Sequence, residues 1–180
     1  MTVTVTPRLG TTDEWTVIDT PVGEMMVVGD DAALHFVHLP DSFLRTAFDP
    51  DRAGTPAAVR AAAEQIAAYF AGALTTFSLP LDPAGTEFQR HVWSALADIA
   101  YGTTESYGEL AARIGNPKAC RAVGLANGRN PIPLVLPCHR VIGANGSLTG
   151  YGGGLELKKS LLDHERAVLG SDAGTRRRAS

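Results

Sequence analysis

The sequence predicts an α+β fold. The N-terminal half is expected to hold a small β-sheet with one helix, and the C-terminal half to be mostly helical with a winged-helix-like helix-turn-helix. Residues 15–40 alternate short apolar runs with turn residues, which is typical of strands. Residues 86–129 instead carry apolar side chains at helical spacing behind N-cap residues. This change of pattern indicates strands first and helices later, as in α+β proteins.

The N-terminal half is expected to contain short strands and one helix. The strands lie in WTVIDTPVGEMMVVGDDAALHFVHLP, divided by turns at Thr20–Gly23 and Asp30–Asp31. The helix lies in TPAAVRAAAEQIAAYFAG, with Thr55 as N-cap, Pro56 as its first residue and Gly72 at its end. The apolar residues that form its core-facing stripe are Val59, Ile66 and Phe70.

The helical half begins at Thr86, the expected N-cap of a helix with one apolar face. Ser106 is expected to cap a short helix that stops at Gly115, and Asn116–Pro117 to start the next helix at once. Two short helices joined by a tight glycine turn are typical of a helix-turn-helix, whose second helix enters a DNA groove. Two packed helices with solvated basic side chains remain the alternative. The basic residues expected on the second helix are Lys118, Arg121 and Arg129.

The segment NPIPLVLPCHRVIG, residues 130–143, combines three prolines, an apolar run and then Cys138 and His139. Prolines restrict the backbone without supplying N–H groups, so we expect a rigid wall here. The turn-rich residues 143–154 predict a loop or hairpin, and an amphipathic helix closes the fold. The residues that face inward from this helix are Leu157, Leu161 and Leu162.

We expect two domains and a tail. Residues 1–82 form a structural α/β domain, residues 83–170 a DNA-binding domain, and residues 171–180 a disordered basic tail whose arginines add weak attraction to DNA. The first ten residues lack the charged-then-apolar pattern of a signal peptide, and no apolar run is long enough to span a bilayer. A cytoplasmic protein without a membrane partner is therefore expected.

Charge is distributed unevenly between the halves. Residues 1–87 hold 4 basic and 12 acidic side chains, a formal charge of −8, whereas residues 88–180 hold 12 basic and 7 acidic ones, a charge of +5. The whole chain carries −3. This asymmetry indicates that the second half alone meets a polyanion, although a basic surface can also serve solubility.

The two cysteines, Cys120 and Cys138, exclude a disulfide framework and a four-cysteine zinc site. His35 and His38 are spaced as two metal ligands could be, but two strand-borne histidines are the simpler interpretation. We therefore expect neither a metal nor a cofactor.

Cys138 and His139 are adjacent, and neighbouring side chains of an extended segment point to opposite faces. Either the backbone turns at Pro137–Cys138, or a water joins thiol and imidazole. A base of this kind lowers the pKa of a thiol and needs a carboxylate behind it, for which Glu165 and Asp163 are candidates. A buried structural cysteine beside a histidine at the core edge is the alternative.

An ordered series of motifs runs from about Thr86 to Glu165: TEFQRHVW, AYG, SYGELA, GNPKACRAVG, NPIP, PCHRV, GYGGG and LLDHE. This series resembles the active-site half of the O6-alkylguanine-DNA alkyltransferases. The N-terminal half resembles the family only in its order of strands and then a helix. The resemblance implies direct repair: the protein binds duplex DNA, flips an O6-alkylguanine out of the stack, and moves the alkyl group irreversibly to its own cysteine. O4-alkylthymine is a further expected substrate, and the expected protein is a monomer, with cooperative binding along DNA left open.

By the same resemblance, Cys138 is the alkyl acceptor, His139 the base acting through a water, and Glu165 the residue that orients His139. Asn130 links the recognition helix to the active-site segment. Tyr107 turns the phosphate and donates a proton to guanine N3, and Arg121 enters the stack in place of the flipped base. The remaining residues expected to contact DNA are Lys118, Ala119, Ala122, Asn127, Gly128 and Arg129. The residues expected to line the substrate pocket are Tyr107, Pro133, Val141, Tyr151, Gly152 and Gly153.

Three departures from the family pattern qualify this expectation. Gly152 stands where some members have a serine, which puts tolerance for bulky alkyl groups in doubt. Cys120 replaces a small residue of the recognition helix. The N-terminal cysteine ligands of the zinc-binding members are missing.

Three other functions compete with the alkyltransferase. A lesion-binding protein without chemistry would lack the acceptor Cys138. A methylation-sensing transcriptional regulator would carry an additional cysteine-rich zinc module. A cysteine hydrolase would need an oxyanion site and access for water, which the apolar run before Cys138 does not indicate.

Overall fold

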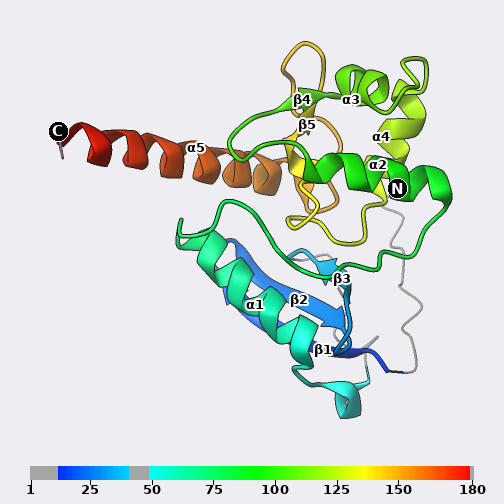
Figure 1. The fold of residues 1–180 in the computed structure, drawn as a ribbon, viewed down its shortest axis with the longest axis vertical. Helices are drawn as coiled ribbons and strands as arrows, with labels where there is room; N and C mark the ends of the chain where they lie inside the picture. The colour runs from blue at the N-terminus through cyan, green and yellow to red at the C-terminus, as the bar shows by residue number, and fades with distance from the viewer. Residues whose placement is uncertain (1–11, 41–48, 179–180) are drawn as a thin grey trace.

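The computed structural model describes residues 12–40 and 49–178, with side chains up to residue 170. Its N-terminal half is an antiparallel sheet in the order β1 (Glu14–Thr20), β2 (Gly23–Gly29) and β3 (Leu34–His38), with helix α1 (Ala57–Phe70) against one face (Figure 1). A 3-10 turn, η2 (Pro50–Arg52), precedes α1. The α+β class and the strand–turn pattern expected from the sequence are confirmed.

The central strand β2 is buried on both faces because its side chains alternate between two apolar clusters. Met25 and Val27 join the main core under α1, whereas Met26 and Val28 pack with partly buried residues of β1 and β3. Alternation of this kind fixes the register of the sheet, since a slip of one residue would exchange the two sets.

The start of α1 differs from the sequence prediction. Its N-cap position is Pro56, and the exposed Thr55 does not cap the helix. Instead, Asp31 in the β2–β3 turn accepts the backbone N–H of Ala57 at 2.8 Å. A distant side chain therefore satisfies an orphan donor of the first turn. The predicted end is confirmed: Gly72 follows the helix with φ +72°, the left-handed conformation that favours glycine.

The C-terminal half contains the predicted helices. Helix α2 (Glu87–Ala97) starts with a Thr86–Gln89 capping box, and α3 (Tyr107–Arg113) with a Ser106–Glu109 capping box. A short parallel sheet, β4 (Glu105–Ser106) with β5 (Val141–Ile142), lies beside α3. The two caps expected here are thus confirmed.

Helix α4 (Cys120–Gly128) starts later than predicted. Residues 116–119 form a turn in which the N–H of Ala119 donates to the carbonyl of Asn116 at 2.9 Å. Lys118 therefore precedes the second helix rather than lying on it, and Arg129 is its C-cap. The prediction of a helix starting at Asn116–Pro117 is wrong because that dipeptide makes the turn itself.

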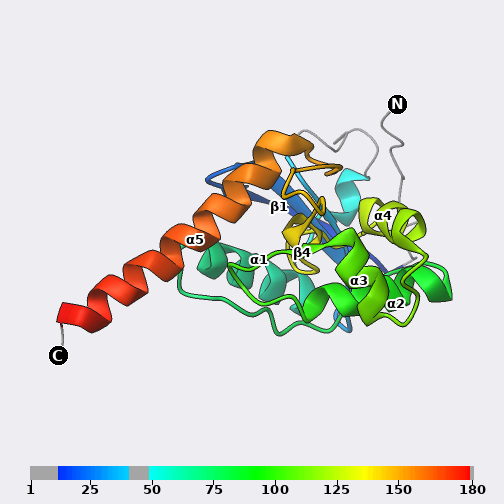
Figure 2. The same cartoon turned by 90° about the horizontal axis from the view of Figure 1, so that it is seen from above.

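Helix α5 (Gly154–Arg178) runs across the boundary between the halves and then away from the body of the molecule (Figures 1 and 2). Leu161 and Leu162 are buried as expected, and Leu157 is partly buried. The backbone of residues 171–178 continues this helix, although a disordered tail was expected from residue 171. The described part of the chain does not include the side chains of the three tail arginines, which were expected to attract DNA. It also does not include the first ten residues, which were expected not to form a signal peptide.

The two halves share one hydrophobic core. A single cluster includes Val59 of α1, Leu96 of α2, Val123 of α4 and Leu161 of α5. The backbone N–H of Val37 in β3 also donates to the carbonyl of Pro131 at 2.9 Å. The sheet therefore supports the buried segment that follows α4.

The capping role of Asp31 is testable by substitution. Asp31→Ala should lower the free energy of unfolding by about 1 kcal/mol, the usual cost of losing a helix cap. Urea unfolding followed by circular dichroism measures the difference. Thr55→Ala is the matched control and should leave stability nearly unchanged; a larger loss in the Thr55 variant would contradict the cap seen in the structure.

Candidate active site

The segment after α4 folds back on itself instead of forming a strand. Residues 131–140 are all buried. The N–H of Leu136 donates to the carbonyl of Ile132 at 2.9 Å, and the N–H of Cys138 to that of Leu136 at 2.7 Å. Pro137, with φ −79° and ψ 65°, is the centre of this inverse γ-turn. Of the two alternatives that the sequence left open here, the backbone turn is confirmed: the chain turns at Pro137 and leads Cys138 into the 3-10 turn η3 (Cys138–Arg140).

Two asparagines join α4 to this segment. The amide of Asn127 donates to the carbonyl of Cys138 at 3.4 Å. The amide of Asn130 donates to the carbonyl of Leu136 at 2.7 Å, and its oxygen accepts the N–H of Ile132 at 3.0 Å. Asn130 thus closes the turn that precedes Cys138.

Cys138 is 4% exposed, and burial raises the pKa of its thiol to about 11. Asn130, Lys158 and the backbone N–H groups of Cys138 and His139 act in the opposite direction without outweighing burial. The expectation that the surroundings lower the pKa of this thiol is therefore wrong. In the free protein Cys138 is a thiol at neutral pH, so its proton must be removed for the sulfur to become a strong nucleophile.

His139 is completely buried beside Glu165, with its Nε2 2.8 Å from Oε1 of the carboxylate. Burial lowers the pKa of His139, although Glu165 raises it. A neutral ring that donates from Nε2 keeps a lone pair on Nδ1. This Nδ1 has no hydrogen-bond partner among the described residues and is therefore the nitrogen available as a base. Of the two carboxylates considered, Asp163 instead pairs with Lys159 and Arg166 on the exposed face of α5.

Glu165 is the buried centre of the site. Besides His139, it accepts hydrogen bonds from the Arg140 guanidinium, the backbone N–H of Gly102 and the hydroxyl of Tyr69. Burial alone raises the pKa of Glu165, but the hydrogen bonds from His139 and Arg140 and the charge of Arg140 outweigh it and hold the pKa at about 2. The carboxylate is thus ionised at any pH at which the protein functions.

The sequence prediction missed three polar residues of this site. Arg140 follows His139 directly, and its guanidinium also donates to the carbonyl of Ile99 at 2.6 Å. Lys158 lies three, four and seven residues before Leu161, Leu162 and Glu165, so helical spacing alone assigns it to the buried face. Tyr69 lies in the other half of the chain, and no local pattern links it to Glu165.

The completely buried Lys158 fixes the loop that follows β5. Its ammonium donates to the carbonyls of Val141 at 2.6 Å and Thr149 at 2.8 Å, and burial lowers its pKa to about 8. Tyr107 donates its hydroxyl to the same Thr149 carbonyl at 3.2 Å. This pair holds the loop close to the N-terminus of α3.

The residues expected in the substrate pocket do not share one environment. Pro133 and Val141 are buried, Tyr151 and Gly153 are half-buried, and Gly152 is exposed. A Cβ on Gly153 would lie 2.5 Å from the side chain of Leu157, so this glycine allows close packing. A Cβ on Gly152 would meet nothing within 4 Å.

The residues expected to contact DNA lie around α4, with one correction. Asn127 is only 2% exposed and faces Cys138, because its polar side chain closes the link to η3. Ala119 is half-buried. The residues of this set that are exposed are Lys118, Arg121, Ala122, Gly128 and Arg129.

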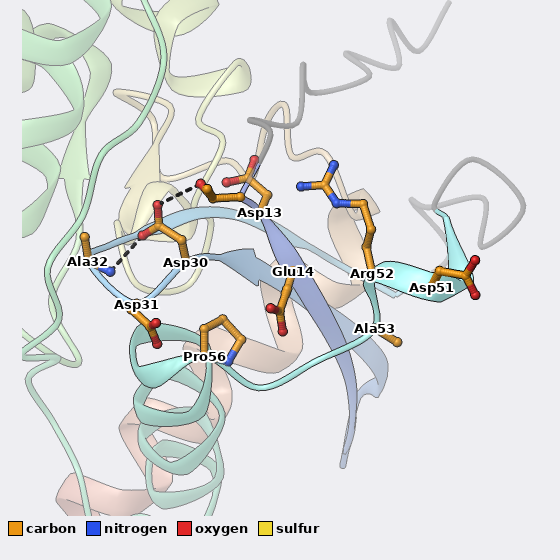
Figure 3. A pocket seen from close by; sticks show the side chains of 10 residues that line it. Asp13, Glu14, Asp30, Asp31, Ala32, Asp51, Arg52, Ala53 and Pro56 are labelled. Carbon is orange, nitrogen blue, oxygen red and sulfur yellow. Dashed lines mark hydrogen bonds between the residues drawn. The ribbon is translucent and has the colours of Figure 1, made fainter.

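A separate open cleft of about 650 Å³ lies in the N-terminal half and has a largely acidic lining (Figure 3). Donor atoms of Asp13, Asp30 and His35 lie there within 4.8 Å of one another. His35 Nδ1 is 2.7 Å from Asp13, while Asp30 accepts the N–H groups of Ala32 and Ala33. The first contact joins β3 to the residue before β1, and the other two close the β2–β3 turn. His38, the other histidine of β3, is buried, which lowers its pKa to about 4, whereas His35 is half-buried.

Comparison with known proteins places both halves in one family. Residues 14–83 match the 6-O-methylguanine DNA methyltransferase, ribonuclease-like domain, and residues 87–167 match the 6-O-methylguanine DNA methyltransferase, DNA binding domain. Along residues 12–40 and 49–178, no helix is both long and apolar enough to cross a membrane.

Individual relatives agree with this match. The chain is 53% identical over 156 residues to the methylated-DNA–protein-cysteine methyltransferase of Mycolicibacterium paratuberculosis, covering 85% of this chain and 92% of the relative. Identity to the Methanosarcina acetivorans protein of the same name is 48% over 151 residues, covering 84% and 97%. The crystal structure of Mycobacterium tuberculosis OGT in complex with DNA is similar, with a TM-score of 0.78 and 49% identity over 86% of this chain and 94% of that one.

The depressed pKa of Glu165 predicts acid sensitivity. Its folded pKa of about 2 lies below the ordinary 4.5, so the stabilisation is complete above pH 4.5 and disappears as the pH falls toward 2. This shift corresponds to roughly 3 kcal/mol. Glu165→Gln should be several kcal/mol less stable at pH 7, because it leaves Arg140 buried without its counter-ion.

Urea unfolding at several pH values between 7 and 3 measures both effects, and the difference between the two proteins should shrink with acid. Asp163→Asn, on the exposed face of the same helix, is the control and should stay within about 1 kcal/mol of the unsubstituted protein at every pH, because exposed ion pairs contribute little. An equal difference between Glu165→Gln and the unsubstituted protein at every pH would contradict the assignment.

Proposed function

Because the chain belongs to the 6-O-methylguanine DNA methyltransferase family, we propose its mechanism in detail. As a methylated-DNA–protein-cysteine methyltransferase, it repairs DNA by alkyl transfer to cysteine. Cys138 accepts the alkyl group of an O6-alkylguanine in duplex DNA, and the transfer is irreversible. Each protein molecule therefore acts once.

The observation that carries this proposal is that a thiol, an imidazole and a carboxylate are buried together at η3. Cys138 is followed by His139, whose Nδ1 has no hydrogen-bond partner in the described part of the chain and whose Nε2 is fixed by the ionised Glu165. This arrangement supplies a base for a thiol that burial keeps protonated. The other cysteine, Cys120, is exposed at the start of α4.

The transfer balances as a displacement at the alkyl carbon. His139 takes the thiol proton through a water, the sulfur electron pair forms the new S–C bond, and the C–O6 bond breaks with its electrons passing to guanine. Tyr107 donates its hydroxyl proton to guanine N3 and recovers one through solvent. Burial raises the pKa of Tyr107, so the hydroxyl keeps its proton at neutral pH until guanine N3 becomes basic enough to take it. The products are guanine and a thioether on Cys138, a bond that water does not readily cleave.

Access to the alkyl group requires the base to leave the stack. Because Cys138 is buried, the nucleotide has to be flipped toward it, at a cost of a few kcal/mol. Arg121 is exposed on α4 and is suited to fill the gap, since a guanidinium plane stacks on bases and also attracts phosphate. Lys118 and Arg129, at either end of α4, then contact the backbone.

The proposed substrate range includes O4-alkylthymine. The open space at Gly152 does not itself limit the size of the alkyl group, but glycine offers only its backbone N–H where a serine hydroxyl would be a second donor. The protein is proposed to act as a cytoplasmic monomer.

Mass spectrometry tests the central proposal. After incubation with a duplex that contains O6-methylguanine, one methyl group should appear on the peptide with Cys138 and none on that with Cys120. Cys138→Ala should abolish transfer and still bind the duplex. Methylation of Cys120, or more than one transfer per protein molecule, would overturn the mechanism.

A comparison of two substrates tests Arg121. Arg121→Ala should slow repair of the duplex by roughly ten- to a hundredfold, on the order of 1–3 kcal/mol, while reaction with the free base O6-methylguanine stays unchanged. Arg129→Ala is the control and should weaken DNA binding and reduce its salt dependence without a separate loss of transfer rate. Equal losses on both substrates would remove the proposed role of Arg121.

A further inference from the structure

Glu165 receives a hydrogen bond from the N-terminal half of the chain. The hydroxyl of Tyr69, on the last turn of α1, donates to Oε1 of Glu165 at 2.9 Å, and both side chains are completely buried. The contact joins residues 96 positions apart in sequence. Neither the mechanism above nor the sequence patterns assign this tyrosine a task.

Tyr69 is held firmly in this position. Its ring stacks on Phe77 at 5.6 Å between centroids and meets the edge of Tyr101 at 5.7 Å. Its backbone carbonyl lies 2.9 Å from Nε2 of His164, the residue before Glu165 on α5. Burial raises the pKa of Tyr69 far above its ordinary value, so the hydroxyl is a donor at every working pH.

The two oxygens of Glu165 have different partners. Oε2 accepts from the N–H of Gly102 at 2.8 Å and from Arg140 at 3.1 Å. Oε1 also accepts from Arg140, and it is the oxygen shared by His139 and Tyr69. A donor that shares an acceptor atom withdraws part of its negative charge, so the Tyr69 hydroxyl limits how strongly Oε1 stabilises a protonated His139.

We propose that Tyr69 is a positioning residue for the alkyl transfer: its hydroxyl fixes Oε1 of Glu165 against Nε2 of His139 and keeps the imidazole neutral and ready to take the Cys138 proton. This role rests on the proposed function of Cys138 and His139. It gives the N-terminal half a part in the chemistry in addition to packing.

Other charged and titratable groups face the same pair. Arg140 on η3 and Tyr101, after α2, lie around Glu165, and Arg140 is 5.4 Å from the centre of the Tyr101 ring. Lys158 on α5 and Arg140 disfavour a protonated His139, and the ring centres of Tyr151 and His139 are 6.5 Å apart. Tyr69→Phe leaves all of these groups in place, so a change in this variant reports the hydroxyl alone.

Tyr101→Phe is the matched control. The Tyr101 hydroxyl is buried in the same neighbourhood and has no hydrogen-bond partner among the described residues. Both substitutions remove one buried oxygen and keep an aromatic ring. The two substitutions differ because only Tyr69→Phe removes a hydrogen bond to Glu165.

Single-turnover kinetics on a duplex with O6-methylguanine measures the transfer rate constant and the DNA dissociation constant separately. Tyr69→Phe should reduce the rate constant about tenfold near neutral pH and leave DNA affinity unchanged. The acidic limb of its rate profile should move to higher pH, because His139 now protonates more readily. Tyr101→Phe should match the unsubstituted protein. Equal rates and equal limbs in the two variants, or a loss confined to DNA affinity, would overturn the role of Tyr69.

Nitrogen NMR of the His139 ring in DNA-free protein separates this inference from the proposed function. The pKa of His139 should rise in Tyr69→Phe and stay unchanged in Tyr101→Phe, whether or not Cys138 reacts with DNA. Failure of the unsubstituted protein to methylate Cys138 would defeat the proposed function alone. An unmoved His139 pKa would defeat the role of Tyr69 alone.

The hydrogen bond between Tyr69 and Glu165 can also be tested in the unsubstituted protein, so this test does not depend on whether a variant folds. The Tyr69 hydroxyl proton should give a slowly exchanging resonance, since it is buried and bonded to a carboxylate. Exchange as fast as that of a solvent-exposed hydroxyl would contradict the hydrogen bond itself.

Discussion

The buried carboxylate of Glu165 is the constraint on which the site depends. An ionised group in the interior is costly unless hydrogen bonds and opposite charge replace its hydration. Here the replacement comes from three parts of the chain besides α5: the end of α1, the Tyr101–Gly102 turn and the 3-10 turn η3. Gly102 has φ +73°, which lets the turn aim its N–H at the carboxylate. Each of these parts is positioned by the same charge.

This arrangement also determines the resting state of the nucleophile. Cys138 is buried against apolar residues, and its thiol is therefore protonated when no substrate is present. A buried neutral thiol is protected from oxidants and stray electrophiles, since the thiolate is the reactive form. If each protein molecule acts once, as proposed, a side reaction at Cys138 inactivates it permanently. Deprotonation of the thiol only when a flipped base is bound would therefore be an advantage. The exposed Cys120 has no comparable protection.

Local features were predictable from sequence, and features that depend on distant contacts were not. The capping boxes at Thr86 and Ser106 involve residues only three positions apart, so the local sequence is enough to predict these N-caps. The cap of α1 failed because Asp31, 26 residues away, replaces Thr55. The family resemblance predicted the place of Glu165 beside His139. No local sequence pattern predicts the contact between Tyr69 and Glu165. Asn127 was assigned to DNA by resemblance, but its side chain is buried and its amide donates to the carbonyl of Cys138, a contact that no local pattern reveals.

The position of Tyr69 explains why the two halves share a core although their charges differ. A DNA-binding surface requires basic residues, and the acidic N-terminal half would repel phosphate if it lay beside α4. It instead supports the opposite side of the reactive segment, through Val37 at Pro131 and through Tyr69 at Glu165. Both contacts are buried or backbone interactions that do not depend on surface charge. The N-terminal half can therefore remain acidic while it holds the carboxylate beside His139, and the exposed basic residues around α4 stay available for the proposed contact with DNA.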